Sequence, residues 1–297
     1  MRVFVTGASG FLGSATVRDL LDEGHQVLGL ARSDAAADAV RAAGAEVLRG
    51  DLTDLDSLRQ GAATTDGVIH TAYIHDFSQF QAAARADRRA VAAMAETLTG
   101  SDRPLVVTSG VPLLLSGETS TEDSTPDPGP FGLERYITEE VAVTFADRGV
   151  RVSVVRLPIV HGAGDHGFLP VLIGMAREQG EAVYVDDGAN CWPSVHRVDA
   201  ARLYRLALEG APAASRWHAV AEEAVPYREI AAAIGRGLGV PVTGVPLEQA
   251  VARLGFLGAF AGTSMRTSSE RTRKELGWEA TESTLLADLD AGHYFRD

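Results

Sequence analysis

The stretch VTGASGFLG spaces Gly7, Gly10 and Gly13 three residues apart, between an apolar run that predicts a strand and a run that predicts a helix. Glycine at such a junction lets the chain turn tightly, lets its backbone approach a pyrophosphate, and lets the helix pack close to the sheet. The free N–H groups at the helix start then bind the anion. A glycine-rich turn without a ligand fits the triplet alone equally well, but its context between strand and helix favours a dinucleotide site.

The residues after the second predicted strand bear on which dinucleotide is bound. An acidic residue there binds the ribose 2′-hydroxyl of NAD, whereas an arginine accommodates the 2′-phosphate of NADP. The sequence GLARSDAA places Arg32 and Ser33 there, with no acidic residue before Asp34. Because a guanidinium matches phosphate geometry, we predict NADP(H) in preference to NAD(H). The alternative is that Arg32 is a solvated loop residue.

The stretch FGLERYITEE places Tyr136 four residues before Glu140 on a predicted helix. A phenol beside a carboxylate stays protonated near neutral pH, because the negative charge disfavours the phenolate. A neutral phenol still gives a proton to an alkoxide that forms during carbonyl or C=C reduction. Alcohol oxidation needs a base and is therefore disfavoured. In the alternative interpretation, Tyr136 only packs on its helix and Glu140 is solvated.

A glycine-rich turn, VHGAGDHGFLP at 160–170, carries His161, Asp165 and His166. His161 follows a predicted strand and is either a second acid or substrate ligand, or a structural residue. The three side chains lack the helical spacing of many metal ligands, so we predict no metal site.

The elements that must position these residues alternate between short apolar strands and alanine-rich helices. This rhythm predicts βαβ units and a parallel sheet with helices on both faces, because strands so apolar are buried on both sides. A polar, proline-rich loop at 116–130 favours a substrate lid. The predicted strands are 2–7, 26–32, 45–51, 65–73, 104–110 and 150–158, and the predicted helices of the first half are 11–24, 36–44, 55–62 and 80–100.

The composition excludes several classes of partner. The 297 residues carry a net charge of −13, which argues against a nucleic acid or an anionic membrane surface and favours a small molecule. Cys191 is the only cysteine, so the chain forms no intrachain disulfide and fits a reducing, cytoplasmic setting. The apolar runs are too short for a signal-peptide core or a membrane span.

The G-x-x-G-x-x-G form resembles the short-chain dehydrogenase/reductase superfamily, specifically its extended or atypical NAD-dependent epimerase/dehydratase-like branch. The resemblance covers nearly the whole chain. VVRLPIVHGAGD at 154–165 is similar to the family's R-L-P-x-V-Y-G-P-G segment, and WPSVHRVDAARL at 192–203 resembles its V-H-V-x-D-x-A element, whose aspartate, here Asp199, caps a helix. Together with Arg32 and Ser33, the cofactor-binding residues that it implies are Gly7, Ser9, Gly10, Phe11, Leu12 and Gly13 in the loop, Asp51 and Leu52 at the adenine, Thr71, Ala72 and Tyr73 under the ribose, and Thr108, Glu140, Pro158 and Val160.

The family pattern also implies a reacting centre. In it, a serine or threonine after the fifth strand orients the substrate carbonyl, a tyrosine transfers the proton, and a lysine four residues later lowers the tyrosine pKa and binds the nicotinamide ribose. By this resemblance Ser109 and Tyr136 are the catalytic candidates, with His161 as a substitute acid. Gly110 stands at the strict serine position and Glu140 at the lysine position, where Glu140 could accept hydrogen bonds from the ribose hydroxyls.

We therefore predict an α/β, doubly wound Rossmann fold with a parallel sheet of about seven strands and a small, mostly helical C-terminal substrate lobe. Residues 1–165, completed by about 186–221, form the dinucleotide-binding domain, and 166–185 with 222–297 form the lobe. The predicted function is an NADP(H)-dependent reductase of a small carbonyl, imine or enone. The alternatives are a nucleotide-sugar epimerase or dehydratase, and a non-catalytic NADP(H) sensor. Relatives often form a homodimer through two helices, here around 85–99 and 131–148.

Overall fold

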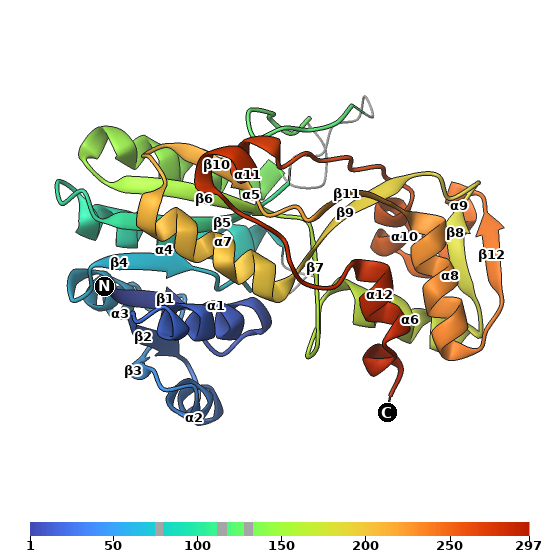
Figure 1. Ribbon diagram of the computed structural model, residues 1–297, viewed down its shortest axis with the longest axis horizontal. Helices are drawn as coiled ribbons and strands as arrows, with labels where there is room; N and C mark the ends of the chain where they lie inside the picture. The colour runs from blue at the N-terminus through green and yellow to red at the C-terminus, as the bar shows by residue number, and fades with distance from the viewer. Residues whose placement is uncertain (75–79, 112–117, 128–132, 297) are drawn as a thin grey trace.

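The computed structural model describes residues 1–74, 80–111, 118–127 and 133–296. These residues form a large domain built on one sheet, with a smaller lobe beside it (Figure 1). The large sheet has seven strands in the described chain, and all neighbouring strands are parallel, which confirms the predicted doubly wound Rossmann fold. In spatial order the strands are β10 (Ser215–His218), β6 (Arg151–Leu157), β5 (Pro104–Gly110), β4 (Gly67–His70), β1 (Arg2–Thr6), β2 (Gln26–Ala31) and β3 (Glu46–Arg49).

Helices cover both faces of this sheet (Figure 1). One face carries α1, α2 and α7, and the other carries α3, α4, α5 and the short 3-10 helix η2. Their bounds are α1 (Phe11–Asp22), α2 (Asp34–Ala42), α3 (Leu55–Ala63), α4 (Phe80–Leu98), α5 (Leu133–Val143), η2 (Thr144–Arg148) and α7 (Arg197–Gly210).

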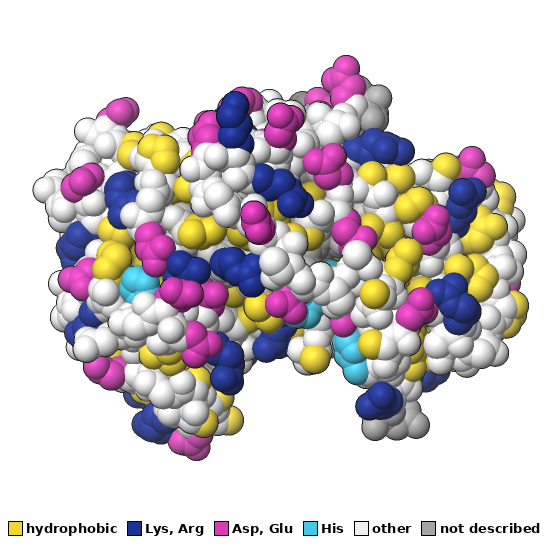
Figure 2. Space-filling view, in the orientation of Figure 1, with side chains coloured by type: hydrophobic (Ala, Val, Ile, Leu, Met, Phe, Trp, Pro, Cys, Tyr) yellow, Lys and Arg dark blue, Asp and Glu magenta, His cyan; other side chains and the backbone are white. Residues whose placement is uncertain are grey.

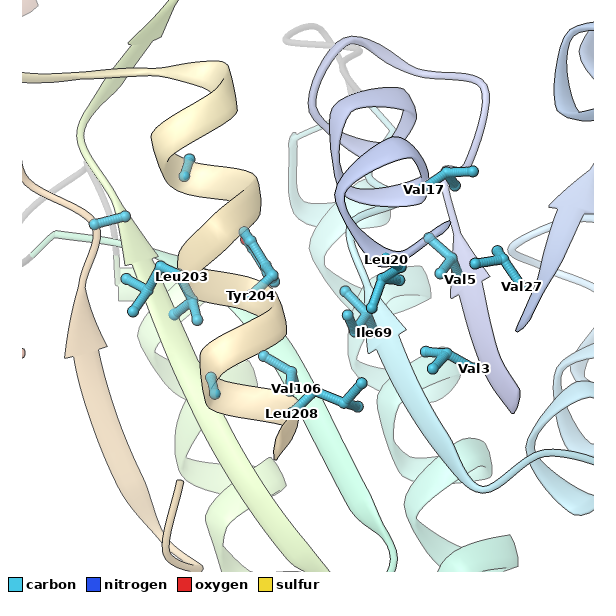
Figure 3. Close-up of a cluster of buried hydrophobic side chains, with 14 of the residues drawn as sticks. Val3, Val5, Val17, Leu20, Val27, Ile69, Val106, Leu203, Tyr204 and Leu208 are labelled. Carbon is cyan, nitrogen blue, oxygen red and sulfur yellow. The ribbon is translucent and has the colours of Figure 1, made fainter. Parts of the chain in front are cut away.

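The core has two layers because side chains of a strand alternate between the faces of the sheet. Val5 and Ile69 point toward Leu20 of α1 and Tyr204 of α7 (Figure 3). Phe4, which precedes Val5 in β1, lies in the opposite cluster under α3 and α4. Burial on both faces explains why the strands read as uninterrupted apolar runs.

The smaller lobe is assembled from separate stretches of the second half of the chain. It holds a three-stranded sheet of β7 (Ile159–His161), β9 (Cys191–His196) and β11 (Glu222–Pro226), and a two-stranded sheet of β8 (Ala182–Val185) and β12 (Val242–Val245), in the part of the chain that the structure describes. Its helices are α6 (Phe168–Gln179), α8 (Tyr227–Leu238), α9 (Leu247–Leu254), α10 (Phe256–Ala261), α12 (Leu285–Asp290) and the 3-10 helix η3 (His293–Phe295). The small sheets were missed by prediction because their strands are short and pair with partners distant in sequence.

The outer edge of β10 is covered by α11 (Glu270–Leu276), which packs on the large domain rather than on the lobe. Arg271 Nη2 donates to the Arg216 carbonyl oxygen (2.9 Å), and the His218 N–H donates to Thr272 Oγ1 (2.8 Å). Both hydrogen bonds use backbone groups on the outer edge of the strand.

The described part of the predicted lid, 118–127, is anchored to the same C-terminal segment. Ser120 forms a β-bridge with Thr267, and its N–H donates to the Arg266 carbonyl oxygen (2.9 Å). The buried Glu122 carboxylate accepts from the N–H (2.9 Å) and hydroxyl (2.7 Å) of Thr272. These bonds hold the middle of the loop against α11.

A buried ion pair fastens α5 to β6. Arg156 Nε and Nη2 donate to the two carboxylate oxygens of Glu139 at 3.0 and 2.5 Å, and both side chains are 1% exposed. Arg216 of β10 also donates to Glu139. Arg156 Nη1 donates to the carbonyl oxygens of Glu122 (3.1 Å) and Ser124 (3.0 Å). One arginine therefore joins the helix, the sheet and the loop at 122–124.

His218 makes folding sensitive to mild acid. Its Nδ1 lies 2.8 Å from the Ser268 carbonyl oxygen and its Nε2 lies 3.4 Å from Arg156 Nη1, so the neutral ring fits both neighbours. Burial, followed by the Arg156 charge, lowers the pKa of His218 to about 4. Since the unfolded chain binds this proton near pH 6.5, stability is full above that pH and falls as the pH drops toward 4.

When the pH is lowered from 7.5 to 5, the unfolding free energy should fall in both proteins. We expect this fall to be smaller in the His218→Gln variant than in the wild type, by on the order of 2 kcal/mol. Urea unfolding at the two pH values measures this difference, and the other histidines cancel in the comparison. Equal pH dependence in both proteins would contradict the assignment.

Candidate active site

The glycine loop between β1 and α1 is a tight backbone turn. Gly7 has a φ of +69°, a left-handed conformation that favours glycine, and a Cβ on it would lie 2.8 Å from the Ala72 nitrogen. A Cβ on Gly13 would lie 2.0 Å from the Gly7 carbonyl oxygen, so α1 packs directly on the turn. Gly10 precedes α1 and offers no side-chain cap. The helix start therefore keeps free N–H groups for an anion, and the bare turn fits the pyrophosphate of a dinucleotide.

The other predicted loop residues lie at the start of α1, facing the turn that follows β7. Ser9 is exposed, and Phe11 and Leu12 are half-buried. The Phe11 ring lies 5.9 Å from the His166 ring and 5.1 Å from the guanidinium of Arg197. The structure thus brings the two glycine-rich segments together. Figure 2 shows the surface hollowed between the large domain and the lobe, on the side where α1 and η3 lie.

Arg32 and Ser33 follow β2 and are exposed. The Ser33 hydroxyl caps α2 by accepting from the Ala36 N–H (3.2 Å). Arg49, at the end of β3, pairs with Asp34 (3.0 Å) and donates to the Ser33 carbonyl oxygen (2.5 Å). Asp34, the first acidic residue after β2, is therefore paired with Arg49.

Asp51 and Leu52 follow β3. The Asp51 carboxylate accepts from the N–H (2.9 Å) and the hydroxyl (2.7 Å) of Thr53, and these hydrogen bonds lower the pKa of Asp51. Leu52 is buried in the core under α3. Asp51 is thus an ionised acceptor beside the ends of β2 and β3.

A chain of polar contacts runs across the carboxyl ends of the central strands. Thr6 Oγ1 lies 2.8 Å from His70 Nδ1, and His70 Nε2 lies 3.1 Å from the carboxylate of Asp87 on α4. The other Asp87 oxygen accepts from Arg135 Nη1 (3.1 Å). Burial alone would raise the pKa of Asp87, but the Arg135 charge and the His70 hydrogen bond hold it below its usual value. The buried carboxylate is therefore charged and orients Arg135.

Arg135 reaches from α5 toward the ends of β4 and β5. Its Nη2 donates to the Thr108 carbonyl oxygen (2.9 Å), and its guanidinium lies 4.2 Å from the centre of the Tyr73 ring. The Thr71 hydroxyl donates to the Thr6 carbonyl oxygen (2.7 Å), and Ala72 lies against Gly7. The segment after β4 consequently links the glycine turn to Arg135.

Thr108 and Ser109 lie on opposite faces of β5. Thr108 Oγ1 donates to the His70 carbonyl oxygen (2.7 Å) and lies 2.6 Å from the Tyr204 hydroxyl of α7. Strand alternation directs the buried Ser109 to the other face, the one covered by α5. Ser109 therefore shares its face of the sheet with Arg135.

Tyr136 and Glu140 lie one turn apart on the side of α5 that faces β10. With Arg216, Trp217 and Arg271 they line a groove of about 360 Å³. Arg216 Nη2 donates to Glu140 (2.5 Å). Burial, and then the charge and hydrogen bond of Glu140, raise the pKa of Tyr136, the direction expected for a phenol beside a carboxylate. The groove borders the edge of the sheet.

His161 ends β7 and is buried. Its Nδ1 lies 2.9 Å from Asp288 of α12, its ring lies 5.4 Å from that of His196, and its Nε2 has no hydrogen-bond partner among the described residues. Burial would raise the pKa of Asp288, but His161 and the neighbouring histidines lower it. His161 thus joins β7 to the lobe, while Pro158 and Val160 beside it are half-buried.

The described residues contain no group of three or more His, Cys, Asp or Glu side chains arranged to hold a metal ion. Nor does this part of the chain form a helix with the length and apolar character that a membrane span needs.

Arg135, Asp87 and His70 belong to this site although no motif in the sequence predicts them. Arg135 is the neighbour of Tyr136. The family pattern places a tyrosine four residues before a cation. If Arg135 is taken as that cation, Phe131 stands at the tyrosine position. Phe131 lies outside the described residues. The position of Arg135 next to Tyr136 was the one signal in the sequence that could have indicated Arg135. Asp87 and His70 belong to no motif.

The predicted cap of α7 is wrong. His196 Nδ1, rather than Asp199, accepts from the Val198 N–H (3.3 Å) at the helix start. Asp199 lies in the first turn and accepts from the N–H groups of Thr281 (3.0 Å) and Glu282 (3.1 Å). Its partners are more than 80 residues away, so local chemistry could not indicate them.

The geometry agrees with comparisons to known proteins. A model of the NAD dependent epimerase/dehydratase family matches residues 3–217. An uncharacterized protein of Schizosaccharomyces pombe is 49% identical over 297 residues, which cover 99% of this chain and 100% of that protein. The 2-alkyl-3-oxoalkanoate reductase of Stenotrophomonas maltophilia is 29% identical over 259 residues, which cover 81% of this chain and 77% of that protein.

Solved structures share the fold. A double mutant of the dTDP-glucose 4,6-dehydratase from Streptomyces venezuelae, with NAD bound, has a TM-score of 0.80 and 22% identity, covering 99% of this chain and 96% of that chain. Fold, glycine turn and family match agree on a dinucleotide-dependent enzyme. The chain therefore belongs to the NAD dependent epimerase/dehydratase family of the short-chain dehydrogenase/reductase superfamily and is an NAD(P)-dependent oxidoreductase of that type.

Proposed function

We propose that this oxidoreductase is an NADP(H)-dependent reductase of a small organic carbonyl, imine or enone. The observation that carries the cofactor preference is the exposed Arg32 after β2, together with the pairing of Asp34 to Arg49. An anionic 2′-phosphate would gain charge-assisted hydrogen bonds from Arg32 and Ser33. The similarity to a 2-alkyl-3-oxoalkanoate reductase supports a carbonyl as the reduced group.

NADPH, when bound, supplies the hydride. The residues of this chain would hold it: the N–H groups after Gly10 would bind the pyrophosphate, and Arg32 and Ser33 would bind the 2′-phosphate. Asp51 and Leu52 border the adenine. Further along the strand ends, the proposed contacts are Thr71, Ala72, Tyr73, Thr108, Pro158 and Val160.

Arg32→Ala tests the cofactor preference. We expect NADPH binding to weaken by about tenfold to a hundredfold, because a charge-assisted hydrogen bond is lost, while NADH binding stays unchanged. Fluorescence titration of both cofactors measures the two dissociation constants. The exposed Arg41→Ala, on the same helix–strand unit, is the matched control and should change neither. Equal affinity of the wild type for NADPH and NADH would reject the preference.

Tyr136 is the proton donor that the sequence predicts, and it stays a prediction. Its position in the groove with Glu140 and Arg216 supports a role there more than a role at the end of β5. Likewise, the predicted ribose contact of Glu140 competes with its hydrogen bond to Arg216.

NADPH consumption with a panel of ketones, aldehydes, imines and enones tests the reaction itself. Oxidation of NADPH by any of them supports the reductase. Tight NADPH binding without turnover would favour the sensor, and redox-neutral conversion of a nucleotide sugar would favour the epimerase or dehydratase.

The predicted homodimer and cytoplasmic location stay predictions, which sedimentation and imaging of a tagged chain would check.

A further inference from the structure

We propose that Arg49 is a second residue that sets the cofactor preference: it neutralises Asp34 and binds the 2′-phosphate of NADPH beside Arg32. This inference rests on the proposed preference for NADP(H). It adds a residue of β3 to a subsite that the sequence pattern places only after β2.

The register of the sheet brings Arg49 to the predicted phosphate subsite. β2 and β3 are parallel neighbours, and Ala31 at the end of β2 pairs with Arg49 at the end of β3. Arg32 follows Ala31 in the chain, so the two arginines stand at adjacent strand ends. The hydrogen bonds of Thr53, and to a smaller extent the charge of Arg32, lower the pKa of Asp51, which follows β3. Both arginines therefore belong to the same end of the β2–β3 pair.

Two contacts hold the Arg49 guanidinium against the start of α2. Its Nη1 donates to the Ser33 carbonyl oxygen (2.5 Å), and its Nη2 lies 3.0 Å from the Asp34 carboxylate. The Ser33 hydroxyl accepts from the Ala36 N–H and keeps its own proton free to donate. A phosphate bound by the Ser33 hydroxyl would consequently lie beside Arg49.

The pair of Arg49 and Asp34 is open to solvent. The Arg49 side chain is 49% exposed and that of Asp34 is 96% exposed. Such pairs contribute little to stability because both charges are solvated, so Arg49 leaves Asp34 at small cost. A phosphate is the stronger partner, since a guanidinium forms two parallel, charge-assisted hydrogen bonds with its oxygens. The guanidinium is thus accessible to a ligand that arrives from solution.

The balance of charges requires a second arginine. A phosphate monoester carries a charge of about −1.5 to −2 at neutral pH. The charges of Arg32 and Asp34 alone cancel, which leaves no net attraction for that anion. Arg49 adds the positive charge that is missing. It also occupies the carboxylate of Asp34, the group that would otherwise accept a hydrogen bond from the ribose 2′-hydroxyl of NAD.

The Arg49→Ala variant tests the proposal. We expect the NADPH dissociation constant to rise by about tenfold or more, because a charge-assisted contact is lost and the Asp34 carboxylate is left to repel the phosphate. NADH binding should not weaken. Fluorescence titration with each cofactor measures both constants. Unchanged NADPH affinity, or equal weakening of NADPH and NADH, would overturn the proposal.

Arg41→Ala is the matched control. Arg41 forms a similar exposed pair with Asp38 (2.8 Å), but in the last turn of α2 instead of at its start. Its loss should leave both dissociation constants unchanged. If Arg41→Ala weakens NADPH binding as much as Arg49→Ala does, the effect is one of general surface charge and the assignment of Arg49 is wrong.

Asp34→Asn separates neutralisation from direct binding. In the Arg49→Ala background it should recover about threefold or more of the lost NADPH affinity, because the unpaired carboxylate is removed. In the wild-type background the gain should be smaller, since Arg49 already neutralises Asp34. Equal gains in both backgrounds would show that Arg49 does not act on Asp34, and would overturn that part of the proposal.

Two adenosine monophosphates isolate the subsite from the rest of the cofactor. Adenosine 2′-phosphate has neither the pyrophosphate nor the nicotinamide, and adenosine 5′-phosphate lacks the 2′-phosphate. In competition with NADPH, Arg49→Ala should weaken binding of the 2′-phosphate by about tenfold and leave that of the 5′-phosphate unchanged. Arg49→Lys should lie between the wild type and Arg49→Ala, because it keeps the charge but not the fork of donors. Equal weakening of both monophosphates by Arg49→Ala would contradict a 2′-phosphate contact.

The two proposals fail in different ways. A wild type that binds NADPH and NADH equally well rejects the proposed preference and the role of Arg49 with it. A wild type that prefers NADPH, together with an Arg49→Ala variant that keeps the same preference, overturns only the role of Arg49.

Discussion

The Glu139→Gln variant is expected to lose about 3–5 kcal/mol of unfolding free energy. The substitution keeps the shape of the side chain but removes the charge that compensates Arg156, whose guanidinium is 1% exposed. A buried charge without its partner is costly because water cannot solvate it. Urea unfolding monitored by circular dichroism measures the change.

Glu140→Gln provides the control at the next position of the same helix. Glu140 also pairs with an arginine, Arg216, but its side chain is 46% exposed, so its loss should cost less than about 1 kcal/mol. Similar losses in both variants would show that burial does not set the strength of these pairs.

Replacing Gly13 by alanine is expected to weaken NADPH binding by about tenfold or more. The added Cβ would lie 2.0 Å from the Gly7 carbonyl oxygen, a contact that no side-chain rotation can relieve. The start of α1 must therefore move away from the glycine turn, and overpacking of this kind typically costs about 1–3 kcal/mol. Fluorescence titration with NADPH and thermal unfolding measure the two effects.

Gly174 gives the matched control. It also lies in a helix, α6, but apart from its chain neighbours and the backbone of its own helix, no atom comes within 4 Å of the position its Cβ would take. Gly174→Ala should leave NADPH binding unchanged and stabilise the protein by up to about 1 kcal/mol. NADPH affinity that survives in Gly13→Ala would mean that the dinucleotide does not rest on this turn.

The Rossmann sheet could be predicted because its signals are local. Each strand is a short apolar run, and the glycines at 7–13 mark the junction of the first strand and the first helix. Buried parallel strands need apolar residues on both faces, so this pattern reports the layered fold directly. The small lobe sheets lack such a signal, since β7 has three residues and finds its partner in β9.

The reacting centre was harder to predict for a geometric reason. Neighbouring residues on a helix point about 100° apart, so Arg135 and Tyr136 leave α5 in different directions. The sequence predicts a loop at 116–130 before α5, and it does not determine how the helix is rotated when it meets the sheet. The structure turns Arg135 toward the end of β5 and Tyr136 toward the groove beside β10.

Long-range partners explain the remaining differences. His161 pairs with Asp288, which lies 127 residues later, and Asp199 binds the backbone near Thr281. Neither pairing follows from spacing or residue type. Both become visible only when the C-terminal segment packs against the rest of the chain.

The cover of β10 by α11 has a consequence for how copies of the protein meet. A strand at the edge of a sheet exposes unpaired N–H and carbonyl groups, which are a template for pairing with another chain. Arg271 and Thr272 occupy such groups of Arg216 and His218. By covering these groups, α11 keeps the edge strand β10 from pairing with a strand of another copy, and so opposes edge-to-edge aggregation.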